Sequence, residues 1–380
     1  MTRRRIVVTV PRSLDTIFLY AYYAMSRSWC YKRIMLAVMC ATVIFVLLKS
    51  VEPPSDKVAT LSEEDSYYQD TNVLHKRIKT IAKQRRKLLT NGTAKYCYRN
   101  DDEYGQTIVF IHFNNRWTDL DTCAVRMAAL FNPQTPICVL HAGPETVQTL
   151  ESCLKGVANV QVAALDVLEI LDGTPLYDWY IKVVPQSTKR RYFHTELLDA
   201  VRAAYLYKHG GTYLDTDVWT LRSLEPIQPN TIAKEANHLR YLSNFVMSFQ
   251  RRHAFMHDVI KQFNKSLIAS RWGSGGPILL TRLYEERWAR ATDKKSNPHE
   301  KIKSNPLVNV VDAKLFYPVH IGDGPILFQS ASYNRAINLT TDAYTVHLWR
   351  EVYRSYWTGL SVPQRGSFVW TLYDQFCKGH

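Results

Sequence analysis

The chain of 380 residues is 46% hydrophobic and 12% aromatic, so it can bury a large core and does not have the composition of a disordered protein. Its formal net charge of +14 would suit a nucleic acid, a membrane surface or an acidic substrate as a partner. Much of the positive charge lies in two basic runs, at residues 3–33 and 76–87, and the chain has neither zinc-finger spacing nor an RNA-recognition signature, so a nucleic-acid-binding function is disfavoured.

Residues 34–48 form the first predicted element, an uncharged apolar run bracketed by Arg33 and Lys49. As a helix rising about 1.5 Å per residue it spans about 22 Å, and the flanking cations can snorkel to make up part of a bilayer core of about 30 Å. The run is apolar on all faces, which disfavours a buried core helix, and no small-residue cleavage site follows it, which disfavours a removed signal peptide. Because basic residues precede the run and acidic residues follow it, we predict a cytoplasmic tail at 1–33, a transmembrane signal anchor at 34–51 and a luminal remainder.

The luminal part is predicted to consist of a stem at residues 52–105 and a folded domain at 106–380. A luminal location would permit disulfides, and glycosylation of the three sequons that begin at Asn91, Asn264 and Asn338. The luminal cysteines are Cys97, Cys123, Cys138, Cys153 and Cys377. Because their number is odd, at least one is free or pairs between chains, and the pairing stays open. Cys138 lies in an apolar run and could instead be a small buried hydrophobe.

From residue 106 onward, patterns typical of strands alternate with patterns typical of helices. Strands are predicted at residues 107–113, 136–143 and 160–165, and helices at residues 120–131 and 145–154. Thr195 is predicted to cap a further helix that runs through Lys208 and ends at Gly210 and Gly211, and the strand TYLD follows. The alternation predicts an α/β fold with a mostly parallel, doubly wound sheet, in which ligands bind beyond the carboxyl ends of the strands.

Two aspartates, Asp215 and Asp217, close this last strand in the motif YLDTDV. Because strand side chains alternate with a period of two, both carboxylates are predicted to point to one side, with Thr216 opposite. Two close carboxylates repel each other, and a divalent cation such as Mg²⁺ or Mn²⁺ would remove the conflict and bridge them to a diphosphate. The alternative is an aspartate-rich turn without a metal.

The surrounding segment, TELLDAVRAAYLYKHGGTYLDTDV at residues 195–218, resembles the nucleotide-sugar-binding segment of the α1,4-glycosyltransferases, a family that includes lactosylceramide α1,4-galactosyltransferases and α1,4-N-acetylglucosaminyltransferases. Further blocks that resemble this family lie at residues 123–133, 174–180, 243–256, 275–282 and 344–349. The resemblance implies a GT-A fold with a mostly parallel central sheet, a UDP-sugar donor, Mn²⁺ or Mg²⁺ as cofactor, and a single-pass type II protein of the Golgi membrane.

Carried over by position, the resemblance implies roles for particular residues. Asp217 would be the principal metal ligand, Asp215 would belong to the ribose and metal shell, and His347 would be a further metal ligand. The donor- and acceptor-binding residues implied in the same way are Asp199, Arg202, Tyr213, Asn244, Gly275, Gly276 and Pro277. Alternatives stay open, because Asp199 and Arg202 at helical positions i and i+3 could form only a local ion pair, and His347 could be a histidine packed beside Trp349.

The chain departs from the family pattern at three places. Leu198 replaces a serine, Arg350 replaces an asparagine, and Arg126-Met127 replaces a Glu-Ser pair. None of these changes touches the aspartate pair, so they bear on the choice of sugar and acceptor more than on the use of a metal and a nucleotide.

The implied function is retaining α1,4-transfer of a hexose, galactose or an N-acetylhexosamine, from a UDP-sugar to a terminal galactose-type residue of a glycosphingolipid. No carboxylate stands out as a nucleophile, which favours front-face attack over a double displacement. Two alternatives are kept: α1,4-N-acetylglucosaminyl transfer to mucin-type O-glycans, and an inactive Golgi lectin or chaperone, which the intact aspartates disfavour. Assembly with itself or with other Golgi enzymes stays open.

Overall fold

The structure is a computed structural model. It describes residues 97, 107–113, 117–142, 147–185, 190–267, 271–288, 308–353 and 364–378. The predicted tail, signal anchor and first sequon lie outside the described residues, as does the predicted stem apart from Cys97. Within the described part of the chain, no helix has the length and apolar character needed to cross a bilayer.

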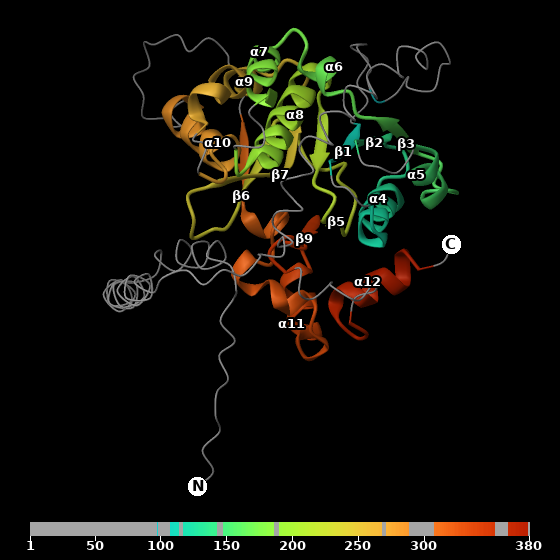
Figure 1. Ribbon diagram of the computed structural model, residues 1–380. Coiled ribbons are helices and arrows are strands. Elements are labelled where there is room, and N and C mark those ends of the chain that lie inside the picture. Colours follow the sequence, from blue (N-terminus) through green and yellow to red (C-terminus); the bar gives the residue numbers. More distant parts are fainter. Residues whose placement is uncertain are drawn as a thin grey trace, which may run out of the picture. The chain divides into compact units, whose positions relative to one another are not determined.

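A seven-stranded sheet forms the centre of the domain, in the order β3-β2-β1-β4-β7-β6-β8 (Figure 1). Its strands are β1 (Ile108–His112), β2 (Ile137–His141), β3 (Val160–Ala164), β4 (Gly211–Leu214), β6 (Thr231–Lys234), β7 (Leu242–Phe249) and β8 (Asn309–Val311). Only β7 runs against its neighbours, so four of the six strand pairings are parallel, and the predicted mostly parallel sheet is confirmed. A second sheet pairs β5 (Val218–Thr220) with β9 (Thr345–His347) in antiparallel register.

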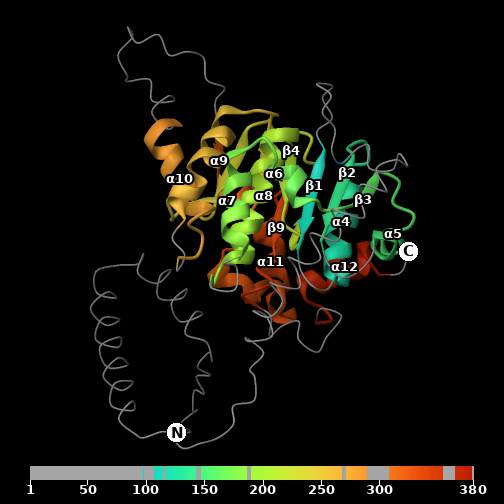
Figure 2. The same ribbon diagram turned by 45° about the horizontal axis from the view of Figure 1, so that its top comes forward.

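Helices connect and cover these strands. They are α4 (Asp119–Phe131), α5 (Val147–Cys153), α6 (Val167–Leu171), α7 (Pro175–Val183), α8 (Phe193–His209), α9 (Ala254–Ser266), α10 (Pro277–Leu283), α11 (Tyr333–Thr340) and α12 (Phe368–Phe376). Shorter helical turns are η3 (Tyr284–Trp288), η5 (Ala313–Leu315), η6 (Ile321–Leu327) and η7 (Ser330–Ser332). Helix α8 lies across the sheet with α6, α7, α9 and α10 grouped around it, and α11 and α12 lie with β9 at the other end (Figure 1). The turned view places α12 beside α4 (Figure 2).

The core lies between the sheet and the buried face of α8. All five residues of β1 are buried, as expected for a central strand that is covered on both faces. From α8, Leu197, Val201 and Tyr205 enter this core at helical spacing and meet Phe255 and Phe263 from α9. Helix α8 is therefore stabilised by apolar side chains that pack into the core together with those of α9.

The ends of α8 differ in how well they were predicted. Helix α8 begins at Phe193, and Tyr192 is its N-cap without a side-chain cap hydrogen bond, so the prediction that Thr195 caps the helix is wrong. The predicted end is confirmed, because Gly210 and Gly211 have φ of 71° and 104°. A Cβ at Gly211 would also lie 2.4 Å from the carbonyl oxygen of Thr107, so the strand after the helix can start only with glycine.

Of the five cysteines from Cys97 onward, four form disulfides. The pairs are Cys97–Cys138 and Cys123–Cys377, and Cys153 is free and exposed. The expectation of at least one free cysteine is confirmed, whereas Cys138 is buried as one half of a disulfide rather than as an unpaired hydrophobe. The sequon asparagines Asn264 and Asn338 are both exposed.

Candidate active site

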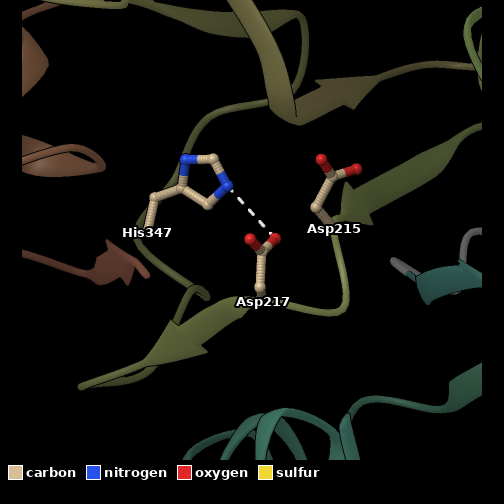
Figure 3. A group of neighbouring side chains, drawn as sticks. All are labelled: Asp215, Asp217 and His347. Carbon is tan, nitrogen blue, oxygen red and sulfur yellow. Dashed lines mark hydrogen bonds and ion pairs between the residues drawn. The ribbon is translucent and has the colours of Figure 1, made fainter. Parts of the chain in front are cut away.

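The two aspartates of the YLDTDV motif lie in a tight turn between β4 and β5. Strand β4 ends at Leu214, the Asp215 N–H donates to the carbonyl oxygen of Phe245, and the Val218 N–H donates to the carbonyl oxygen of Asp215, both at 3.0 Å. The expected strand alternation across the motif is therefore wrong, because these residues do not continue the strand. The turn nevertheless brings one oxygen of Asp215, one of Asp217 and a ring nitrogen of His347 within 4.8 Å of one another (Figure 3).

His347 reaches this turn through the small second sheet, in which it pairs with Val218. Its Nε2 lies 3.1 Å from Oδ1 of Asp217. The imidazole also packs against Trp349 and Phe245, with ring centroids 4.1 and 4.4 Å away. His347 is thus both a packed histidine and a neighbour of the aspartates, so the two alternatives from the sequence do not exclude each other.

Asp215 is held from the side of helix α8. Arg202 Nη1 donates to Asp215 Oδ1 at 3.0 Å and to the carbonyl oxygen of Asn244 at 2.8 Å. The Tyr213 hydroxyl donates to the same Asp215 oxygen, and its ring lies under the Arg202 guanidinium, 4.8 Å from the ring centroid. Both donors use Oδ1, so these contacts of the Asp215 carboxylate fall on a single oxygen.

Asp199 completes the polar face of α8. Its Oδ1 accepts a hydrogen bond from the Asn244 amide at 2.7 Å and lies 3.6 Å from Arg202 Nη2. The i,i+3 ion pair that the sequence offered as an alternative is therefore present. In addition, Arg202 links Asp199 to Asp215, so the helix face and the aspartate turn form one network.

The two predicted glycines lie against this network. A Cβ on Gly276 would come 2.4 Å from the Asn244 amide nitrogen and 2.8 Å from a carboxylate oxygen of Asp199. A Cβ on Gly275 would come 2.8 Å from the ring of Phe263. Pro277 then starts α10 in its first turn, where its missing N–H costs nothing. A cavity of about 10 Å³, roughly the size of one water molecule, lies between these glycines and the polar face of α8.

The pKa values of the carboxylates follow from burial and from their partners. Burial raises the pKa of Asp199 to about 6, although Arg202 and the Asn244 amide favour its ionised form. Burial likewise raises the pKa of Asp215 against the opposing charge of Arg202. Burial alone would also raise the pKa of Asp217, but its contacts with His347 and with Arg350 outweigh it and lower that pKa.

A divalent cation fits this arrangement. Four acids meet at the site, namely Asp121, Asp199, Asp215 and Asp217. Two guanidinium groups pair with them, those of Arg202 and Arg350. The excess of two negative charges is what one divalent cation would balance. Carboxylate oxygens with one imidazole nitrogen are a ligand set that Mn²⁺ accepts, and Mg²⁺ prefers the oxygens alone.

Sequence reasoning missed two members of the site. Asp121 received no role, and Arg350 was noted only as a departure from the family pattern. In the structure the Arg350 N–H donates to Asp217 Oδ2 at 3.0 Å, and its guanidinium pairs with Asp121 at 2.5 Å. The only sequence signal for Asp121 is its place three residues after Thr118, the spacing of a capping box, which predicts a helix start and not a site.

Two family models match this chain, and together they cover the site apart from Asn244. The model described as "Glycosyltransferase sugar-binding region containing DXD motif" matches residues 118–235, which include both aspartates of the turn. The model described as "Alpha 1,4-glycosyltransferase conserved region" matches residues 248–379, which include His347.

Curated relatives match over most of the folded domain. The chain is 31% identical to lactosylceramide 4-alpha-galactosyltransferase of Pan troglodytes, over 60% of this chain and 64% of that protein. It is 32% identical to the Pongo pygmaeus protein of the same name, over 51% of this chain and 84% of that protein. It is 28% identical to alpha-1,4-N-acetylglucosaminyltransferase of Homo sapiens, over 71% of this chain and 78% of that protein. The match thus spans somewhat less than two thirds of the chimpanzee protein and more of the other two.

Proposed function

Because the chain belongs to the alpha 1,4-glycosyltransferase family, we propose that it transfers a hexose from a UDP-sugar to a terminal galactose-type residue and forms an α1,4 linkage. The observation that carries the proposal is the convergence of Asp215, Asp217 and His347 beyond the end of β4, beside the polar face of α8. Ligands of mostly parallel sheets bind beyond the carboxyl ends of the strands, which is where these three residues lie. This placement supports a fold of the GT-A type. The relatives that act on lactosylceramide by name support a glycosphingolipid as the acceptor.

Asp215, Asp217 and His347 are the residues that would hold Mn²⁺ or Mg²⁺. A bound cation would act there as a Lewis acid toward the diphosphate of the donor. The chain's own contribution is to orient these ligands, since Arg202 and Tyr213 fix Asp215 through one oxygen and leave the other available. Asp199, Asn244 and Gly276 form the wall beside them, where we place ribose and sugar contacts.

We favour front-face transfer with retention. In this step the bond between the sugar C1 and the diphosphate oxygen breaks, and a bond from C1 to the acceptor O4 forms on the same face. The proton of the acceptor hydroxyl moves to the departing diphosphate, so that the products are UDP and the extended glycan. The site supports this route because Asp199, Asp215 and Asp217 each contact a cationic or imidazole partner, and a carboxylate held in this way is a poor nucleophile.

We also propose that the protein is a single-pass type II Golgi protein anchored by residues 34–51. The apolar run and its charge asymmetry support this topology. The two disulfides of the folded domain support a luminal location, since disulfides persist in the secretory pathway and are rare in the cytosol.

Purified full-length protein should be assayed with UDP-galactose, UDP-N-acetylglucosamine and UDP-N-acetylgalactosamine against lactosylceramide and mucin-type O-glycans. Mass spectrometry would identify the product, and NMR would give its linkage and anomeric configuration. Asp217→Ala should lower turnover by about 10²-fold or more, because it removes a ligand of the proposed metal. Asp178→Asn, an exposed acid on α7, is the matched control and should leave turnover unchanged. Equal turnover of Asp217→Ala and wild type would contradict the proposed role of the metal.

A second candidate is α1,4-N-acetylglucosaminyl transfer to mucin-type O-glycans. The human α1,4-N-acetylglucosaminyltransferase supports it, because it matches 71% of this chain over 78% of its own length. The donor and acceptor panel separates the two candidates directly. Binding of a glycan without turnover of any donor would instead favour a lectin or chaperone.

A further inference from the structure

We propose that Asp121 and Arg350 are positioning residues, which fix the Asp217 carboxylate and thereby the candidate metal site through one ion pair. The proposed link to a metal and UDP rests on the proposed function. The contacts that carry the inference do not depend on it.

A single short segment, residues 347–350, holds Asp217 on three sides. His347 Nε2 lies 3.1 Å from Oδ1, and the Arg350 N–H donates to Oδ2 at 3.0 Å. The Leu348 N–H donates to the carbonyl oxygen of Asp217 at 2.9 Å. The direction of the Asp217 side chain therefore depends on where this segment lies.

The segment holds a conformation that needs external support. Trp349 has φ of +53°, in the left-handed region that a bulky side chain rarely adopts. On one side the indole N–H of Trp349 donates to the carbonyl oxygen of Val319 at 2.9 Å. On the other side the Arg350 guanidinium anchors the segment to helix α4.

Asp121 is a fixed point for that anchor. Its side chain is fully buried, and its Oδ2 accepts from the Thr118 N–H at 2.9 Å and from the Thr118 hydroxyl at 2.5 Å as part of the capping box of α4. Its Oδ1 pairs with Arg350 Nη1 at 2.5 Å. The second arm of the same guanidinium lies 3.4 Å from the Thr216 hydroxyl, between the two aspartates of the turn. One arginine thus joins the start of α4, the aspartate turn and the segment that holds Asp217.

Arg350 is the cation that pairs with the fully buried Asp121 carboxylate. A neutral amide could not balance a fully buried carboxylate, and an unpaired buried charge is strongly destabilising. Arg350 and Asp121 therefore act as a pair, and neither would keep its role without the other.

Two variants of the full-length protein test the proposal. Asp121→Asn removes the charge but keeps an acceptor for Thr118, and Arg350→Lys keeps the charge but loses the second arm. The control is Asp258→Asn, on helix α9, which removes an acid that pairs with Arg287 at 3.2 Å. Hydrogen exchange of residues 345–353 is measured without metal, and affinity for Mn²⁺ in the presence of UDP is measured by electron paramagnetic resonance.

We expect both Asp121→Asn and Arg350→Lys to speed exchange of the Leu348 and Arg350 amides by about tenfold, while exchange in α9 stays unchanged. Mn²⁺ affinity should fall by about tenfold in Asp121→Asn and less in Arg350→Lys, and the control should stay within twofold in both measurements. Unchanged exchange in residues 345–353 in the variants that fold would overturn the proposal. Faster exchange with unchanged Mn²⁺ affinity would overturn it too, because the anchor would then not position the site. If the wild type binds no Mn²⁺, the proposed function fails, whereas faster exchange would still support the anchor.

Discussion

Replacing Asp199 by asparagine is expected to make the protein more stable at neutral pH while weakening its binding of the donor. Asp199 is 4% exposed, and burial raises its pKa to about 6 from an ordinary value of 3.8. Asparagine has nearly the same shape and keeps the oxygen that accepts from the Asn244 amide at 2.7 Å. The substitution therefore removes the charge with little change in packing.

The magnitude follows from linkage. A pKa that is higher in the folded than in the unfolded state means that folding favours the protonated carboxyl. The contribution of the protonated Asp199 to the unfolding free energy is fully present below pH about 4 and is lost as the pH rises through about 6. The total loss of unfolding free energy is about 3 kcal/mol, at 1.36 kcal/mol per pKa unit. Asp199→Asn avoids this cost, so its unfolding free energy should exceed that of the wild type by about 3 kcal/mol at pH 7.5 and by about half as much at pH 5.

Urea denaturation at pH 5 and pH 7.5, followed by tryptophan fluorescence, measures both differences, and calorimetry with UDP measures the loss of binding. Asp121→Asn is the matched control, because the pKa of Asp121 is shifted in the opposite direction. Burial alone would raise that pKa, but the contacts with Arg350, His112 and Thr118 outweigh burial and lower it. Its amide variant should lose about the same stability at pH 7.5 and at pH 5, because a carboxyl with a lowered pKa stays ionised at both, and the loss should shrink only below pH about 4. A stability gain of Asp199→Asn that is the same at both pH values, or a loss at pH 7.5, would refute this reasoning.

Three further predictions concern packing, a disulfide and the metal. Gly276→Ala places a Cβ 2.4 Å from the Asn244 amide, so the unfolding free energy should fall by about 1–3 kcal/mol in urea titrations. The control is Gly322→Ala, whose Cβ would have its nearest neighbour 3.4 Å away and should change the unfolding free energy little. Cys123→Ser opens a disulfide that spans 254 residues and should cost about 2–5 kcal/mol by the same measurement, while Cys153→Ser, at a free exposed cysteine, should stay within about 0.5 kcal/mol. Chelation with EDTA should abolish sugar transfer and added Mn²⁺ should restore it; transfer that survives chelation would argue against a metal in the site.

Much of the fold could be predicted because it depends on local pattern. The strands at residues 107–113 and 160–165 were found from runs of apolar, β-branched residues, and the helix at 120–131 from apolar residues at helical spacing. The end of α8 was found because only glycine adopts the positive φ of Gly210 at low cost. The start of α8 was missed because the preceding Tyr192 makes no side-chain cap, and tertiary packing extends the helix past the polar residue that looked like its cap.

The candidate site was predicted only in part. Residue type pointed to Asp215 and Asp217, since two acids so close together are costly without a cation. The prediction that both side chains point to one side relied on the alternation of a strand. The structure has a turn there instead, which the hydrogen bond from the Val218 N–H to the Asp215 carbonyl oxygen closes. His347 entered through resemblance alone, and the small sheet that brings it to Asp217 has no local signature beyond three buried residues.

By itself the sequence determined the alternation of strands and helices, the place of the acidic pair after a buried strand, and the apolar run near the N-terminus. These depend on neighbours in the chain, through propensity, periodicity and charge. Only the tertiary structure decided what surrounds the acids: Arg202 with its bond to Asp215, and the pair of Asp121 with Arg350, whose members are 229 residues apart. The physical reason is that such a pair forms only when the fold brings the two residues together, and no local pattern records which distant residue will balance a buried carboxylate.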